Sequence, residues 1–191
     1  REEKKESKEK EDILNSINQR ILDAIIDDNE EHFLDLISQS KYDSNPNQPF
    51  IMMNYKLPLI LSDEPTYASL CAFFGAEQCF TTLSLMFPEG IESGEFNDKQ
   101  GRSPIHFACF SDKLNILRMY DQNGFKLDTS DSRGFLPCHY SAMAGTVNVM
   151  KYLWSKGVDI ISPTNYDSMT PFHLACLYGH INVVTFLNEK V

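Results

Sequence analysis

The chain has 191 residues, 42% of them apolar, so it is long enough for one domain or two small ones with a substantial core. Its net charge is −10 and it has no basic stripe of the kind that binds phosphates, so we expect neither nucleic acid nor an anionic membrane surface as a partner. No apolar run reaches the roughly 18–20 residues of a membrane-spanning helix and no secretory leader is visible, so we expect no membrane insertion.

The excess negative charge lies in the N-terminal half. Residues 1–97 carry 8 Lys and Arg against 19 Asp and Glu, whereas residues 98–191 carry 9 against 8. Solubility is the simplest explanation of this acidity. The five cysteines are odd in number and form no C-x-x-C pair, unlike those of a secreted disulfide scaffold. We therefore expect reduced thiols and a cytoplasmic or nuclear location.

The first segments of the chain are strongly charged or rich in proline. Residues 1–12 are a charged N-terminal extension that either lengthens the first helix through i,i+4 pairs or forms a disordered end. Residues 13–39 have the rhythm of two short helices and predict an N-terminal helical cap with an acidic outer face. The acidic residues of that face are Asp23, Asp27, Asp28, Glu30, Glu31 and Asp35. Residues 40–63 contain three prolines, which predicts an insertion loop, with the apolar stretch Phe50–Tyr55 docked on the helices.

Residues 64–97 predict a further pair of helices. Within this segment, residues 66–83 align without gaps to residues 170–187 near the C-terminus. The identical positions in the two segments include Thr66, Leu70, Gly75 and Leu83. The earlier segment lacks the proline and histidine of the later one, so we interpret it as a degenerate copy of a repeat.

The C-terminal half contains a fixed period. Three prolines recur 33 and 34 residues apart, and a histidine follows each of them two residues later. The pairs are Pro104 with His106, Pro137 with His139, and Pro171 with His173. The period divides this half into the units 98–130, 131–164 and a truncated unit 165–191.

Each unit predicts a tight turn followed by two helices. In the first unit Asp98 and Gly101 form the turn, and Ser103 caps the first helix. Pro104 takes the first helical position, where a missing N–H costs nothing. Small residues after the histidine let adjacent first helices approach, and the second helix presents an apolar face. One such pair cannot bury its own apolar face, so the units should stack.

Some positions depart from this pattern. Leu136 caps the middle unit weakly, which costs about 1 kcal/mol. Asp112 and Ser168 stand where glycine is expected, so we expect distorted loops there. We assign Trp154 to the core between second helices.

The three units resemble ankyrin repeats, whose pattern is D-x-x-G-x-T-P-L-H-x-A-A-x-x-G-H followed by a second apolar helix. The last unit matches through Thr170–His173 and through Gly179 and His180. The resemblance implies an all-α fold, an ankyrin-type α-solenoid of stacked helix-turn-helix repeats with β-turn or hairpin tips. The block A-x-F-F-G-x-x-x-C-F-x-x-L in the degenerate copy resembles large ankyrin families of parasitic protists.

The histidines and cysteines raise the question of chemistry. The resemblance implies that His106, His139 and His173 are structural hydrogen-bonders between neighbouring turns. Consecutive histidines should lie roughly 10 Å apart, too far to share a metal ion. Cys138 and His139 would point in different directions on a helix and lack an orienting third group. No nucleotide-binding or hydrolase motif occurs, so we expect no enzyme, no metal and no cofactor.

The resemblance also implies that a partner binds along the concave side, on the turn tips and the ends of the first helices. The candidates form a stripe of aromatic and methionine side chains flanked by Arg102 and Arg133, and interface cores are enriched in these types. Half of the stripe could instead pack on the next repeat. The candidate residues are Phe73, Phe74, Lys99, Gln100, Arg102, Phe110, Ser111, Arg133, Phe135, Met143, Tyr166, Asp167, Met169, Leu177 and Tyr178.

The main hypothesis is therefore a monomeric scaffold or adaptor that binds a partner protein. One alternative is a targeting or regulatory arm of a larger enzyme, channel or effector. Another is a purely structural or self-associating repeat protein. The sequence does not name the partner, because the surfaces of such repeats diversify on a constant scaffold.

Overall fold

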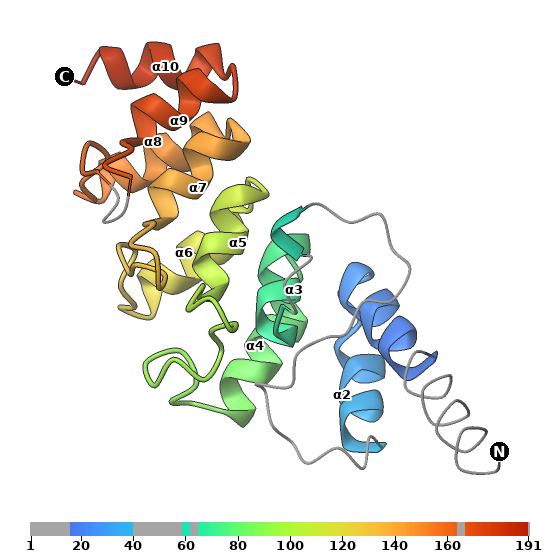
Figure 1. The fold of residues 1–191 in the computed structure, drawn as a ribbon. Coiled ribbons are helices and arrows are strands. Elements are labelled where there is room, and N and C mark those ends of the chain that lie inside the picture. The colour runs from blue at the N-terminus through green and yellow to red at the C-terminus, as the bar shows by residue number, and fades with distance from the viewer. Residues whose placement is uncertain (1–15, 40–58, 62–64, 164–166, 191) are drawn as a thin grey trace, which may run out of the picture.

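The computed structural model of the chain describes residues 16–39, 59–61, 65–163 and 167–190. Within these ranges the regular secondary structure is helical, and the helices come in pairs that follow one another in a row (Figure 1). Buried apolar side chains from every pair form one core cluster along the row. The predicted all-α solenoid of stacked helix pairs is therefore confirmed.

The first pair consists of a helix over residues 16–26 and α2 (Glu30–Gln39). Asp28 has a φ of 48° between them, a left-handed conformation that ends the first helix. The Asn29 side chain accepts a hydrogen bond from the His32 amide at 3.0 Å and so caps the start of α2. The fully buried side chains of this pair are Ile21, Ile25 and Phe33.

Several predicted features of the N-terminal half lie outside the described residues. These are the extension 1–12 and the docking of the stretch Phe50–Tyr55. Of the predicted insertion 40–63, the structure describes the 3-10 helix η1 (Leu59–Leu61), in which Leu61 is buried in the core.

The second pair consists of α3 (Tyr67–Phe74) and α4 (Glu77–Met86). Thr66 caps α3 by accepting a hydrogen bond from the Ser69 amide, and its hydroxyl donates to the Phe96 carbonyl at 2.9 Å. This pair therefore keeps a capped first helix although it lacks the proline and histidine.

The three remaining pairs occupy the C-terminal half. They are α5 (Pro104–Phe110) with α6 (Leu114–Gln122), α7 (Pro137–Ala144) with α8 (Val147–Ser155), and α9 (Pro171–Leu177) with α10 (Ile181–Asn188). The first helices α3, α5, α7 and α9 pack against one another in this order, as do α6, α8 and α10, while α2 packs against α4. Figure 1 shows the resulting curved row from green to red.

The turn tips before α5 and α7 have the predicted geometry. In the first tip the Gly101 amide donates to the Asp98 carbonyl at 2.9 Å, and the Asp98 carboxylate accepts from the Gln100 and Arg102 amides at 2.9 Å each. The Ser132 amide of the next tip donates to the Gln100 carbonyl at 2.9 Å. Backbone hydrogen bonds therefore link consecutive tips as well as closing each one.

Two sequence expectations need correction. Asp112 and Ser168 adopt φ values of 60° and 51°, so they reproduce the left-handed conformation of the expected glycines rather than distorting the loops. Trp154 is 40% exposed, whereas its neighbour Leu153 is fully buried, so Trp154 is not a core residue. The α8 side chains that enter the core are Val149, Met150 and Leu153, and Trp154 lies about 100° further around the helix.

Candidate protein-binding surface

The predicted site residues at the turn tips differ in exposure. Lys99, Arg133 and Asp167 are exposed, whereas Phe135 and Met169 are half-buried. The guanidinium of Arg133 lies 5.0 Å from the centre of the Phe135 ring, a cation–π contact on an accessible surface.

Two further tip predictions have a different outcome. Arg102 is only 3% exposed, because its guanidinium pairs with Asp98 at 2.5 Å and lies over the Phe107 ring. Its prediction as a partner-binding residue is wrong, since the side chain stabilises the tip from inside. Tyr166 lies outside the described residues.

The predicted residues at the ends of the first helices become more exposed toward the C-terminus. Phe73, Phe74, Phe110 and Met143 are half-buried and pack against the core, so these repeats cover part of the predicted stripe. Ser111 is also half-buried, and its hydroxyl donates to a carbonyl of its own helix. Leu177 and Tyr178, in contrast, are 68% and 55% exposed at the end of α9. The apolar character of the stripe is therefore most accessible at its C-terminal end.

The repeat histidines connect one unit to the next. His106 accepts from the Ser103 amide at Nδ1, at 3.0 Å, which leaves the proton on Nε2 to be donated to the Phe135 carbonyl at 3.2 Å. His139 likewise accepts from the Leu136 amide and donates to the Ser162 carbonyl, both at 3.0 Å. Burial lowers the pKa of both imidazoles, which favours the neutral form. The predicted structural role is confirmed for these two residues.

His173 keeps only the first of these contacts in the described structure. Its Nδ1 accepts from the Thr170 amide at 3.2 Å, but the side chain is exposed. Leu136 makes no side-chain cap, as predicted, and the His139 imidazole satisfies its amide instead.

Cys138, which precedes a repeat histidine, lacks the features of a nucleophile. Burial raises the pKa of Cys138 to about 12, so its thiol is protonated at neutral pH. The neighbouring His139 cannot act as its base at Nδ1, because that nitrogen already accepts the Leu136 amide. Among the described residues no group of three or more His, Cys, Asp or Glu side chains could hold a metal ion, and no described helix is long and apolar enough to cross a membrane.

Sequence reasoning missed the side chains that join consecutive units. At the start of the second helices α6, α8 and α10, one side chain donates to a carbonyl at the end of the preceding unit's first helix. The bonds are Asn115 to Gly75 at 2.8 Å, Thr146 to Cys109 at 2.7 Å and His180 to Met143 at 2.9 Å. Thr146 and His180 hold the same repeat position but differ in type, and Asn115 lies two positions further along its unit, so the aligned sequences do not reveal the shared contact.

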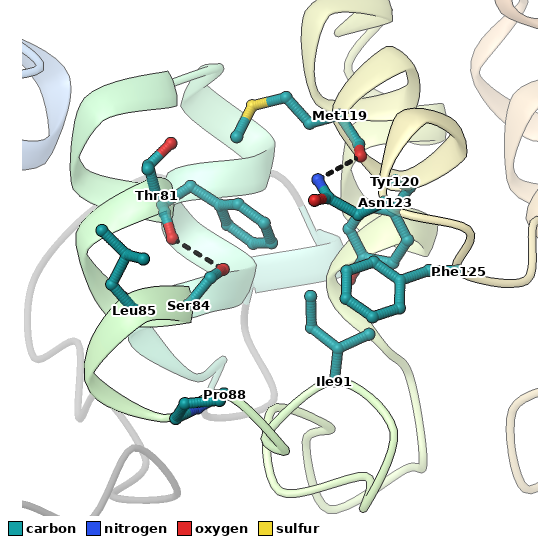
Figure 2. Close-up of a pocket in the computed structure, with 10 residues that line it drawn as sticks. Thr81, Ser84, Leu85, Pro88, Ile91, Met119, Tyr120, Asn123 and Phe125 are labelled. Atoms are coloured by element: carbon teal, nitrogen blue, oxygen red, sulfur yellow. Dashed lines mark hydrogen bonds between the residues drawn. The ribbon is translucent and has the colours of Figure 1, made fainter.

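A second missed feature is a pair of neighbouring cavities beside α6 and the connection 87–97, the first of which α4 also lines. Their volumes are about 290 and 430 Å³, and Ile91, Tyr120 and Phe125 line both. In Figure 2, Ser84 of α4 and Phe125 lie on opposite sides of the first cavity, and Leu85 lies further out along α4. A sequence signal does exist, since 37 residues separate Thr66 from Ser103 while later repeats keep 33 or 34. The longer connection interrupts the regular packing where the cavities occur.

Comparison with known proteins decides the family. The profile of ankyrin repeats, three copies long, matches residues 68–162 and residues 115–190, more than half of the chain. The chain belongs to the ankyrin repeat family. The all-α fold and the hydrogen bonds of His106 and His139 agree with this assignment.

Ankyrin relatives of this chain are much longer proteins. Protein VAPYRIN-LIKE of Medicago truncatula is 32% identical over 93 residues, 48% of this chain and 19% of that protein. Tyrosine-protein kinase HTK16 of Hydra vulgaris is 32% identical over 94 residues, 48% of this chain and 12% of the kinase. Alpha-latrocrustotoxin-Lt1a of Latrodectus tredecimguttatus is 30% identical over 144 residues, 70% of this chain and 10% of the toxin. The chain thus spans less than a fifth of each of these relatives.

Proposed function

We propose that this ankyrin chain is a protein-interaction module, a scaffold or adaptor, that binds a partner protein on its turn tips and the ends of its first helices. Ankyrin repeats generally mediate protein–protein interaction. The observation that carries the proposal is the accessible apolar end of α9, where Leu177 and Tyr178 continue the line of the half-buried Phe110 and Met143.

The surroundings of this line support a protein partner. Arg133, with a side chain that is 53% exposed, stacks on Phe135 and still presents its guanidinium to a partner's carboxylate or aromatic ring. Lys99 and Asp167 add exposed charges at the tips. An apolar centre with a charged rim is the usual composition of an interface.

Affinity capture with variants that change only exposed residues tests this proposal without disturbing the core. The triple variant Arg133→Ala/Leu177→Ala/Tyr178→Ala should lose most partner proteins that the wild-type chain enriches in quantitative mass spectrometry. The double variant Ile26→Ala/Trp154→Ala removes other exposed apolar side chains and should retain them. Circular dichroism checks that both variants are folded. An unchanged set of captured proteins with the folded triple variant would contradict the proposal.

A second proposal is that the chain is the targeting or regulatory arm of a larger protein. The relatives support it, because the chain covers only 10–19% of their length and one of them is a tyrosine-protein kinase. Sequencing the full transcript tests it: a catalytic or channel domain in the same reading frame would support the arm, and an open reading frame without one would contradict it.

A further inference from the structure

The cavities beside the connection 87–97 lie apart from the surface proposed above. The first cavity is bounded by the second helices α4 and α6, whereas the proposed surface is formed by first helices and tips. Phe80, Tyr120 and Phe125 provide aromatic walls, with ring centres 5.8 Å apart for the first two and 5.6 Å apart for the last two. A volume of about 290 Å³ in the first cavity is sufficient for one large aromatic side chain.

The rim of the first cavity is apolar and accessible. Leu85 lines the cavity and is 74% exposed, and the neighbouring Met86 is exposed as well. In Figure 2, Leu85 lies at the α4 edge of the cavity, opposite Phe125. An exposed leucine beside an aromatic pocket favours a partner that covers the rim as well as filling the pocket.

The aromatic wall shared by both cavities includes Tyr120, which is 2% exposed. Its hydroxyl lies beside the Ile105 backbone of α5, so it is the ring that contributes to the pocket. Tryptophan, the largest aromatic side chain, offers the greatest area for contact with the rings of Phe80, Tyr120 and Phe125. Tryptophan therefore fits this pocket better than a smaller apolar residue.

The α4 side of the pocket is acidic. Residues 64–97 contain five glutamates and neither Lys nor Arg. Glu89 and Glu92 are exposed beside the cavities, next to Pro88 and Ile91 of the lining, and Lys126 is the one basic side chain among the residues that line them. An anionic rim attracts cationic segments and repels acidic ones.

From these observations we propose that the cavity between α4, α6 and the connection 87–97 is a second docking site, which takes a tryptophan anchor from a basic peptide segment of a protein partner. The tryptophan fills the aromatic pocket, Leu85 packs on the adjacent backbone, and Lys or Arg residues beside the anchor face Glu89 and Glu92. The site does not depend on the surface of the first helices and can be tested separately from it.

Fluorescence anisotropy with two labelled peptides, Lys-Arg-Trp-Arg-Lys and Lys-Arg-Ala-Arg-Lys, tests the anchor. The wild-type chain should bind the tryptophan peptide about ten- to thirty-fold more tightly than the alanine peptide, because a buried aromatic anchor dominates such contacts. Ser84→Phe fills the first cavity and should abolish the preference. Asn188→Phe places the same side chain at the equivalent exposed position of α10 and should preserve it.

The same assay tests the charge. Glu89→Gln/Glu92→Gln should weaken binding of both peptides about three- to ten-fold at low salt, and the effect should shrink at high salt. Asp23→Asn/Glu31→Gln changes the net charge equally at exposed positions of the first pair and should have less than about a two-fold effect. Equal affinity for the two peptides, or an unchanged preference in a folded Ser84→Phe variant, would overturn the proposal.

Discussion

The degenerate unit 64–97 and the regular C-terminal repeats link the start of a first helix to a backbone carbonyl beyond its helix pair with different side chains. In the regular repeats an imidazole links the start of a first helix to the following tip, as His106 does between Ser103 and Phe135. In the degenerate unit the hydroxyls of Thr66 and Ser69 do so, with Thr66 donating to the Phe96 carbonyl. The comparison teaches that stacking requires a polar side chain that joins the start of a first helix to a backbone carbonyl beyond its own helix pair, rather than one residue type at one position.

The hydrogen bonds at the joints between consecutive helix pairs also differ between the two halves. In the regular half, Thr146 and His180 donate side-chain hydrogen bonds to carbonyls of the preceding unit. At the first joint the direction is reversed, because the Asp28 carboxylate accepts from the Gln78 and Cys79 amides at 3.0 and 3.1 Å. The acidic residues of the first pair are therefore not only a solvated outer face, since Asp28 and Glu30 both bind α4 residues.

The largest expected effect tests whether the core of the degenerate unit contributes as much to the free energy of unfolding as the core of a regular repeat. Leu83 of α4 and Leu153 of α8 hold the same repeat position, and both are buried. Leu83→Ala and Leu153→Ala should each reduce the free energy of unfolding by about 3 kcal/mol, because each leaves a cavity in the core. Trp154→Ala, one residue away and partly exposed, should cost clearly less. Urea denaturation measures all three, and a small loss for Leu83→Ala alone would mean that the first units unfold independently.

A pH effect distinguishes the imidazole links of the regular repeats from the hydroxyl links of the degenerate unit. Burial lowers the pKa of His106 and His139, so they stay neutral in the folded chain while the unfolded chain binds protons below about pH 6.5. The unfolded state then binds more protons, and the free energy of unfolding falls as the pH decreases. We expect a loss of about 2–3 kcal/mol between pH 7.5 and 5.5.

The variant His106→Gln/His139→Gln supplies the control for this effect. It lacks both imidazoles, so its stability should be lower at pH 7.5 but should change much less between the two pH values. Urea denaturation at each pH measures the slope. An equally steep decrease in the double variant would show that other groups cause it.

The period of the sequence is sufficient to predict the stacked helix pairs, the tips and the structural histidines, since each depends on local pattern. It does not determine the orientation of side chains at the tips, and Arg102 turns inward because Asp98 offers it a buried partner. Leu153 and Trp154 are adjacent apolar residues, and only one can face the core. The polar residues Ser84, Asp121 and Asn188 at the repeat position of Trp154 are the signal for its exposure. The cavities depend on the path of an aperiodic connection, which no repeat pattern describes.

A moderate effect tests the first joint. Asp28→Ala removes the carboxylate that caps α4 and should cost about 1–2 kcal/mol, with hydrogen exchange accelerated in α4 more than in α8. Asp28→Asn keeps an acceptor and tolerates the positive φ, so its loss should be smaller. Asp27→Ala, at the exposed neighbouring position, should change stability by less than about 0.5 kcal/mol. Equal losses of stability for Asp28→Ala and Asp27→Ala would show that the hydrogen bonds from α4 to Asp28 are not the cause.

The smallest effect concerns two positions at which the regular half lacks the expected glycine of the repeat. Ser168 and Asp112 have positive φ values where Gly134 and Gly145 stand in the middle unit, and a side chain there is strained. Ser168→Gly should therefore raise the free energy of unfolding by about 1 kcal/mol, and Asp112→Gly by less, because aspartate tolerates this conformation better than serine. Thermal denaturation measures both. Gly145→Ala is the reverse change and should be destabilising, since its Cβ would lie 2.5 Å from the His180 ring. A stabilising Gly145→Ala would show that the left-handed conformation and the close approach of His180 do not constrain this loop.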